Sequence, residues 1–331
     1  MSVPRSPDAE LRIAAIGAGW IMPFHLDALD RLGRTRLVGV ASTRIERARA
    51  LAVPRGAPAF DDARRMLDEV RPDAVFVAVP PAAAIAVLAD VVERGIPFLT
   101  EKPLAATDAA GPAAIAAAVA DRGLVAAVGY HFRGLDALVQ VRERLARTRV
   151  HLVTARWLCG TPGATWWQHE AEGGGQVVEQ ATHLYDLARH LVGEASVVGA
   201  ASTREERGVP PGADVVDATA AVLRFETGAV GSFANTRRLD SAVVELEVAA
   251  TDLLVTIRRV GDAPGSCEVV FEDGDGRRTV PPGRDPYEAQ AAAFLDAIEG
   301  QAPGRVLSPY ADALATDRLT RAVVAATGRA G

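Results

Sequence analysis

The lysine at position 102 is the residue whose type most clearly suggests chemistry. The chain has 36 lysine and arginine residues, and only Lys102 among them is a lysine. It follows an apolar, strand-like segment that ends at Leu99, in the run Thr100-Glu101-Lys102-Pro103. A guanidinium stays protonated, whereas burial and neighbouring charges can tune an ammonium for proton transfer. We therefore expect Lys102 to transfer a proton or bind a substrate; the alternative is a surface lysine that drift has retained.

A carboxylate and an imidazole follow the glycine run at 173–175. Glu179 and His183 are four residues apart, and a helix over this segment places them on one polar stripe with Asp186 and His190. Such a pair suits acid-base chemistry at a carbinol carbon, with Asp186 placed to orient the imidazole. Two alternatives stay open from the residues alone: a metal site, for which no third ligand is obvious nearby, and a polar stripe that faces water.

The segment 11–22 predicts a strand, a glycine turn and the start of a helix. Gly17 permits a tight turn, and Gly19 lets the backbone approach a pyrophosphate beside the N-H groups of a helix N-terminus. Met22 stands where the third glycine of this fingerprint would be. An ordinary turn between a strand and a helix is the alternative. The residues that we assign to this dinucleotide site are Gly17, Gly19, Trp20 and Ile21.

The end of the second strand-like run bears on the choice of cofactor. NAD enzymes of this kind usually hold the ribose hydroxyls there with an acid. Here the run ends in Ala41-Ser42-Thr43-Arg44, where two hydroxyls and a guanidinium would bind a 2'-phosphate. We therefore expect NADP, with NAD possible. The alternative is that Ser42 caps the next helix and Arg44 lies on its surface.

Two further stretches contribute candidate residues. Val79 and Pro80 end the run that begins at Ala74, and we assign them to the cofactor site together with Glu101 and Lys102. Trp166 and Trp167 lie in the loop before the 175–191 segment, where they would form a wall for a sugar face or a nicotinamide. Packing in the core or at an interface is the alternative. We place both tryptophans and Asp186 among the substrate-binding residues.

The elements that must position these residues alternate in type through the first 130 residues. Strands that alternate with crossover helices indicate a doubly wound parallel sheet of the Rossmann type. We expect strands at 11–16, 36–41, 74–79, 97–99 and 125–128, and helices near 21–32, 44–52, 61–70, 82–93 and 108–121.

Beyond about residue 133 the pattern changes to one long helix and then strands without helices between them. This order predicts a C-terminal α+β domain with a large, open, mainly antiparallel sheet. We expect a helix at 175–191, strands at 196–203, 215–225, 229–236, 243–249 and 253–258, and closing helices at 287–299 and 309–326. The fold class is therefore α/β, with a Rossmann domain at 1–130 and a substrate-binding and oligomerisation domain at 131–331.

The composition limits the possible partners and compartments. The chain has 331 residues, 49% of them hydrophobic, and a net charge of -6 without a basic stripe, so we expect no nucleic acid partner. The N-terminal residues lack an apolar core of the kind that a signal peptide needs, and no apolar stretch approaches the roughly 20 residues that cross a bilayer. Two cysteines without a bridging pattern fit a reducing cytoplasm, where we expect the protein to act.

Three of these motifs occur in an order that resembles one family. The Gly17-Ala18-Gly19 turn, the Glu101-Lys102-Pro103 run and the glycine run leading to Glu179 and His183 together resemble the Gfo/Idh/MocA oxidoreductases, the family of glucose-fructose oxidoreductase and inositol dehydrogenase. The similarity extends from about residue 11 to residue 326. It implies hydride transfer between NAD(P) and a sugar, polyol or related carbonyl.

The resemblance also implies roles for single residues. Lys102 corresponds to the family's active-site lysine and His183 to its catalytic histidine, while Glu179 stands where many members have aspartate. His131 and Arg133 fall where members often carry polar residues that line the substrate. In the family the open C-terminal sheet often forms an interface, so a homodimer or homotetramer is expected.

We therefore expect an enzyme that transfers a hydride between a nicotinamide and a secondary alcohol or ketone of a sugar, cyclitol or sugar derivative. His183 would exchange the hydroxyl proton because its unperturbed pKa lies near 6.5, and Lys102 would orient the substrate and stabilise the alkoxide. Glu179 completes the catalytic set, and we assign no metal. Two other hypotheses are redox-assisted elimination or glycoside cleavage with a tightly bound cofactor, and a non-catalytic NADP-binding sensor.

Overall fold

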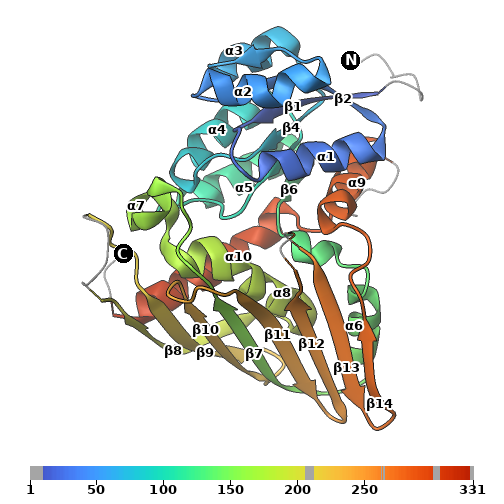
Figure 1. The fold of residues 1–331 in the computed structure, drawn as a ribbon, viewed down its shortest axis with the longest axis vertical. Helices are drawn as coiled ribbons and strands as arrows, with labels where there is room; N and C mark the ends of the chain where they lie inside the picture. Colours follow the sequence, from blue (N-terminus) through green and yellow to red (C-terminus); the bar gives the residue numbers. More distant parts are fainter. Residues whose placement is uncertain (1–9, 206–211, 262, 264, 301–305, 329–331) are drawn as a thin grey trace.

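The chain folds around two β-sheets, one from residues 11–128 and one from residues 150–280 (Figure 1). The computed structural model describes residues 10–205, 212–261, 263, 265–300 and 306–328. The first sheet is parallel throughout, and its strands lie in the order β3-β2-β1-β4-β5-β6. Its strands are β1 (Leu11–Ile16), β2 (Thr35–Ala41), β3 (Ala59–Phe60), β4 (Ala74–Val77), β5 (Phe98–Thr100) and β6 (Ala126–Val128).

Helices cover both faces of this first sheet. Successive side chains of a strand point to opposite faces, so Ile13 and Ala15 of β1 pack with α1 and α2, whereas Ala14 and Ile16 pack with α3, α4 and α5. Burial on both faces explains why these strands are nearly continuous apolar runs. The connecting helices are α1 (Met22–Leu32), α2 (Ile45–Ala52), α3 (Ala63–Val70), α4 (Pro81–Glu93) and α5 (Gly111–Arg122).

The second sheet has the strand order β14-β13-β12-β11-β7-β10-β9-β8. All of its neighbouring strands are antiparallel except β7 and β10, which run parallel. Its strands are β7 (Val150–Leu158), β8 (Ala195–Thr203), β9 (Ala218–Phe225), β10 (Val230–Thr236), β11 (Val243–Ala250), β12 (Leu253–Arg259), β13 (Cys267–Asp273) and β14 (Gly276–Val280).

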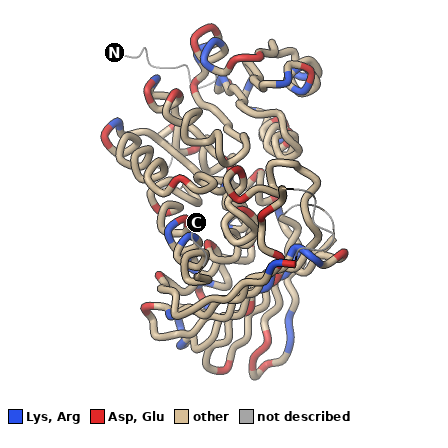
Figure 2. The backbone as a smooth tube through the Cα atoms, turned by 90° about the vertical axis from the view of Figure 1, so that its left-hand side faces the viewer, with Lys and Arg blue, Asp and Glu red and all other residues tan. Residues whose placement is uncertain are grey.

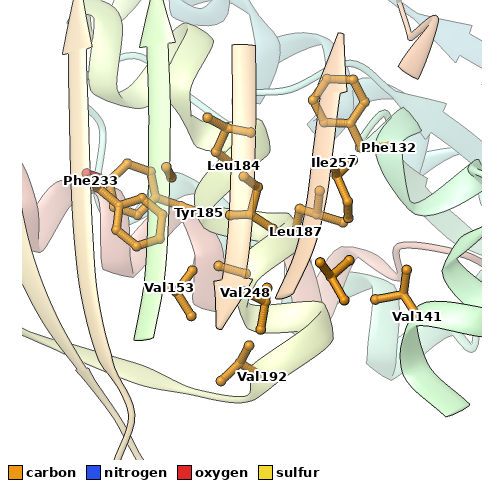
Figure 3. Packing of buried hydrophobic residues seen from close by; sticks show 14 of the residues in the cluster. Phe132, Val141, Val153, Leu184, Tyr185, Leu187, Val192, Phe233, Val248 and Ile257 are labelled. Carbon is orange, nitrogen blue, oxygen red and sulfur yellow. The ribbon is translucent and has the colours of Figure 1, made fainter. Parts of the chain in front are cut away.

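One face of this second sheet packs against helices. Tyr185, Leu184 and Leu187 of α8 (Thr182–Val192) lie against strand residues such as Phe233, whose ring stacks on that of Tyr185 at 4.5 Å (Figure 3). Helix α6 (Leu138–Leu145) adds Val141 to the same core. Each fully buried side chain of this kind contributes roughly 1.5–3 kcal/mol to stability.

The opposite face of the second sheet carries apolar side chains that stay exposed. Leu152, Val198, Val222 and Val230 are between 39% and 58% exposed and come from the neighbouring strands β7, β8, β9 and β10. A charged pair, Arg156 of β7 with Glu245 of the neighbouring strand β11, lies next to them. Over the whole molecule, basic and acidic residues are interspersed (Figure 2).

The helix α9 (Pro286–Ile298) returns from the second sheet to the first. Its residues Phe294 and Leu295 are fully buried in the core formed by β1 and α1. The Phe294 ring meets the edge of Phe76 of β4 at 5.7 Å. A segment far along the chain therefore completes one face of the N-terminal sheet.

The last helix, α10 (Tyr310–Ala326), belongs to both cores. Its first turns place Tyr310 and Ala313 in the core beneath β6 and α5. Its later residues Leu319 and Val323 pack in the core of the second sheet. The closing helices thus join two sheets that the sequence analysis assigned to separate domains.

The expected architecture of a parallel sheet and a mainly antiparallel sheet is confirmed. Some elements differ from expectation. The segment predicted as a helix at 175–191 begins with a π-helical turn, Val177–Ala181, before α8, and the strand expected from 215 begins at Ala218. The elements that were not predicted from the sequence include β3, β7, β13, β14, α6 and the short helix α7 (Glu170–Gly173). Within the described ranges, no helix is long and apolar enough to cross a membrane.

Candidate active site

The glycine turn after β1 forms a cradle at the edge of the first sheet. Gly17 has a φ of +96°, and a Cβ on it would lie 2.0 Å from the carbonyl oxygen of Ala78, so only glycine fits. No described atom lies within 4 Å of the Cβ position of Gly19, and α1 begins shortly afterwards at Met22. Accessible backbone beside a helix N-terminus suits a pyrophosphate. The residues present therefore fit a dinucleotide.

The other predicted cofactor residues follow strands that end at this same edge. In the parallel sheet, Ile16 of β1 lies beside Ala41 of β2 and Val77 of β4. The segments after these three residues are therefore neighbours, and this arrangement brings together Trp20, Ile21, Ser42, Thr43, Arg44, Val79 and Pro80.

The segment after β2 agrees in part with the capping alternative, and its role towards a 2'-phosphate stays a prediction. The Ser42 Oγ accepts a hydrogen bond of 3.2 Å from the backbone N-H of Arg44, which is the N-cap residue of α2. The side chains of Thr43 and Arg44 are exposed, as is the Trp20 ring at 70%. The local turn therefore leaves a hydroxyl and a guanidinium accessible at the edge of the sheet.

Lys102 lies just beyond β5 and reaches the second domain's π-helical turn. Its Nζ donates to both the carbonyl oxygen and the Oε1 of Glu179, each at 2.6 Å. The indole Nε1 of Trp167 donates to the other carboxylate oxygen at 2.7 Å. An ammonium has three donors, and the described residues accept from two of them. The structure thus brings together Lys102 and Glu179, which the sequence separates by 77 positions.

His183, on the first turn of α8, is enclosed by aromatic rings. It stacks on Trp157 at 5.7 Å and meets the ring of His131 at 4.6 Å. Its Nδ1 is buried without a hydrogen-bond partner among the described residues. Burial lowers the pKa of His183 well below its usual value, and the nearby charge of Lys102 lowers it further. The imidazole is therefore neutral at pH 7 and able to accept a proton.

His131 is held by a residue that the sequence analysis missed. Its ring stacks on Tyr287 of α9 at 4.7 Å, with 17° between the planes. Burial is the largest cause that lowers the pKa of His131 to about 3. Its assignment to the substrate site stays a prediction, and the structure adds that it is neutral and lies beside His183.

Arg133 and Asp186 bind each other rather than facing His183. The guanidinium donates two hydrogen bonds of 2.7 and 2.6 Å to the carboxylate, and both side chains are buried. Asp186 accepts a further hydrogen bond from Thr316 of α10. The expectation that Asp186 orients the His183 imidazole is therefore wrong, because its oxygens are bound to Arg133 and Thr316. In this structure the pair fastens α8 to neighbouring segments.

The two adjacent tryptophans differ in their surroundings. Trp167 is 2% exposed and uses its N-H to hold Glu179, so core packing describes it better than a substrate wall. Trp166 is half-buried and lies against Gly173, where a Cβ would approach its ring to 3.3 Å. Its role in substrate binding stays a prediction.

Three residues near the site were not predicted from the sequence. His25 of α1 lies 2.7 Å from Oε1 of the buried Glu101, and Tyr287 and Trp157 flank the two site imidazoles. A single histidine or aromatic residue in an apolar helix or strand resembles ordinary core. Only the short apolar alternation around Trp157, which the sequence analysis did not interpret as a strand, contained a usable hint.

The strand order, the glycine cradle and the lysine beyond β5 define a dinucleotide-binding oxidoreductase. Residues 11–130 match the family model described as an oxidoreductase family with an NAD-binding Rossmann fold, and residues 140–254 match the GFO/IDH/MocA C-terminal domain. The chain therefore belongs to the GFO/IDH/MocA family of oxidoreductases.

Individual relatives agree with this assignment. D-glucoside 3-dehydrogenase of Escherichia coli strain K12 is 31% identical over 195 residues, which are 56% of this chain and 55% of that protein, little more than half its length. Levoglucosan dehydrogenase in complex with NADH has a TM-score of 0.84 at 23% identity, covering 96% of this chain and 97% of that one. A 3-ketoreductase from Actinomadura kijaniata in a complex with NADP has a TM-score of 0.84 at 22% identity, covering 96% and 98%. The structural similarities show the fold.

The depressed pKa of His183 should appear in the pH dependence of stability. An unfolded histidine takes up a proton near pH 6.5, whereas the buried imidazole stays neutral, so acidification below 6.5 favours unfolding. From pH 7 to pH 5 the free energy of unfolding should fall by about 2 kcal/mol more in the native protein than in His183→Gln. Urea unfolding of both proteins at the two pH values measures this difference, and equal losses would contradict the neutral imidazole.

Proposed function

We propose that the protein transfers a hydride between a nicotinamide dinucleotide and a secondary alcohol or ketone of a sugar, cyclitol or sugar derivative. The observation that carries the proposal is the placement of Lys102. Lys102 lies beyond the end of β5, at the same end of the sheet as the glycine cradle. Its ammonium is fixed by Glu179, and its charge lowers the pKa of His183. A cationic donor and a neutral base thus meet beside a dinucleotide site.

The contacts of the two groups divide their tasks. Lys102 donates to a carboxylate and a carbonyl oxygen, both of which only accept, so these two contacts hold the ammonium in place. Its third N-H binds the substrate oxygen and stabilises negative charge on it. The neutral His183 accepts the hydroxyl proton during oxidation and returns it during reduction. A bound nicotinamide supplies the hydride acceptor or donor at that carbon.

The substrate class is supported by the names of the relatives. Two of them are named as dehydrogenases of a D-glucoside and of levoglucosan, and a third is named as a 3-ketoreductase. The carboxylate of Glu179 is held from two sides, by Lys102 and by Trp167. We propose that a sugar hydroxyl adjacent to the reacting carbon meets this carboxylate, since an ionised carboxylate accepts hydrogen bonds from hydroxyl groups.

We propose that NADP is preferred over NAD. The segment after β2 presents Ser42, Thr43 and Arg44 and no acidic residue, and the Thr43 and Arg44 side chains are exposed where the adenosine ribose of a dinucleotide would lie. A guanidinium and hydroxyl groups bind a phosphate, whereas a carboxylate there would repel it.

Turnover should depend on the charge of Lys102. We expect absorbance changes of the nicotinamide with at least one member of a panel of glucosides, anhydrosugars, inositols and nucleotide-linked keto sugars. Lys102→Met, which keeps the length but not the charge, should lower kcat by roughly 10²- to 10³-fold, as for the loss of a donor to an oxyanion.

The matched control for this experiment is Arg122→Met, an exposed residue at the end of α5 that should leave turnover unchanged. Dinucleotide binding without turnover across the panel would instead favour redox-assisted elimination or a sensor.

Cofactor preference should depend on Arg44. Arg44→Ala removes a charge-assisted hydrogen bond to the 2'-phosphate, so the KM for NADP should rise about tenfold while that for NAD stays unchanged. Steady-state kinetics with both cofactors measure the ratio, with the exposed Arg49→Ala on the same helix as control. An equal change for both cofactors would contradict the 2'-phosphate contact.

We propose that the exposed face of the second sheet joins copies of the chain into a homodimer or homotetramer. Its exposed apolar residues, among them Val222 at 44%, form one surface across adjacent strands. Val222→Asp should shift the protein to monomer in sedimentation velocity. The exposed Val139→Asp on α6, away from this face, should not. A native protein that sediments as a monomer would exclude the proposed interface.

A further inference from the structure

A buried imidazole and carboxylate lie beneath Lys102. His25 is on the helix α1 that begins at the glycine cradle, and its Nε2 lies 2.7 Å from Oε1 of Glu101. His25 is 1% exposed and Glu101 is 9% exposed. The mechanism above uses neither side chain. A buried charged group needs a partner, so the contact is a strong constraint on both residues.

The charge state of Glu101 sets the direction of this hydrogen bond. Burial raises the pKa of Glu101, but the hydrogen bond and charge of His25 and the charge of Lys102 outweigh it, and the pKa lies below its usual value. Glu101 is therefore a carboxylate, which only accepts. The Nε2 of His25 must donate.

The second oxygen of the carboxylate holds the backbone of the lysine itself. Oε2 of Glu101 accepts a hydrogen bond of 3.2 Å from the backbone N-H of Lys102. Gly129 lies on the other side of the carboxylate, where a Cβ would approach Oε1 to 2.6 Å. Only glycine at position 129 leaves room for the carboxylate, whose rotation is fixed by His25 and the Lys102 N-H.

Aromatic rings in turn fix the imidazole. The His25 ring meets the edge of Tyr287 at 5.3 Å and lies 5.6 Å from Phe76 of β4. Tyr287 also stacks on His131, which contacts His183. The ring of His25 is thus packed into the same structure that holds the second site imidazole.

We propose that His25 is a positioning residue for the active-site lysine: through Glu101 it fixes the backbone of Lys102 and so links the dinucleotide helix α1 to the ammonium. The inference rests on the proposed function for its kinetic consequence. Its structural part stands without turnover. His25 touches neither substrate nor reacting atoms in this arrangement, and it acts through Glu101.

The single lysine of the chain provides a direct readout. Protein labelled with ¹⁵N-lysine has one backbone amide signal from lysine, that of Lys102. His25→Phe keeps a ring among the aromatic neighbours but removes the donor, so the carboxylate loses its partner and the Lys102 amide signal should shift or broaden. His25→Gln places an amide N-H where the imidazole Nε2 was and should restore the native signal.

Kinetics provide the second readout. His25→Phe should lower kcat roughly ten- to a hundredfold, the scale expected when a catalytic group is displaced by about 1 Å, and should change the KM for dinucleotide less than kcat. His25→Gln should recover most of kcat. His151→Phe, the same change at an exposed histidine of β7, should leave both the amide signal and kcat unchanged.

The two proposals fail in different ways. An unchanged Lys102 signal in His25→Phe, or no recovery in His25→Gln, would overturn the positioning role whether or not the enzyme turns over. A shifted signal that His25→Gln restores supports the positioning role even where the native protein is inactive towards every substrate of the panel. That inactivity would count against the proposed reaction alone.

Discussion

The ion pair between Lys102 and Glu179 is the interaction on which the site depends. Its two side chains are 13% and 14% exposed, so the contact carries a desolvation cost that good geometry must offset. Hydrogen bonds from Trp167 and to the Glu179 carbonyl oxygen provide that geometry. Because the lysine belongs to the first sheet and the carboxylate to the layer over the second, the pair forms only when both layers are packed together.

The surroundings of this pair separate the charge states of the site residues. The ammonium is surrounded by acceptors, while the imidazole of His183 is surrounded by rings that disfavour its charged form. Groups whose environments favour opposite protonation behaviour are a common basis for acid-base catalysis. The fold achieves this with residues from β5, the π-helical turn, α8 and α9, which meet at one place.

Much of the scaffold could be predicted because its physical causes are local. Buried parallel strands are apolar runs in the sequence. The strand and helix patterns on either side of Gly17 predict a turn there, and this turn requires glycine. Lys102 could be singled out because its type is unique in the chain. The predicted closeness of Glu179 and His183 follows from helical spacing.

The remaining features arise from contacts between distant segments. That Asp186 binds Arg133 and not His183 depends on the position of the 131–134 turn against α8, which no local pattern encodes. His25 and Glu101 are 76 positions apart, and the sequence around His25 has no distinctive pattern that would point to Glu101 as its partner. Strands β13 and β14 were missed because neither alternates: β13 has three consecutive buried residues, and β14 is almost entirely exposed.

The shared helix α10 bears on how the chain folds as it is made. The six strands of the first sheet leave the ribosome before α9 and α10, so one face of that sheet lacks α9, and the other lacks the first turns of α10, until these helices have emerged. Apolar surface of the N-terminal sheet therefore stays uncovered while residues 129–285 are made. Both cores are complete only when α10 has been made. The formation of the candidate dinucleotide site is therefore coupled to that of the candidate substrate site.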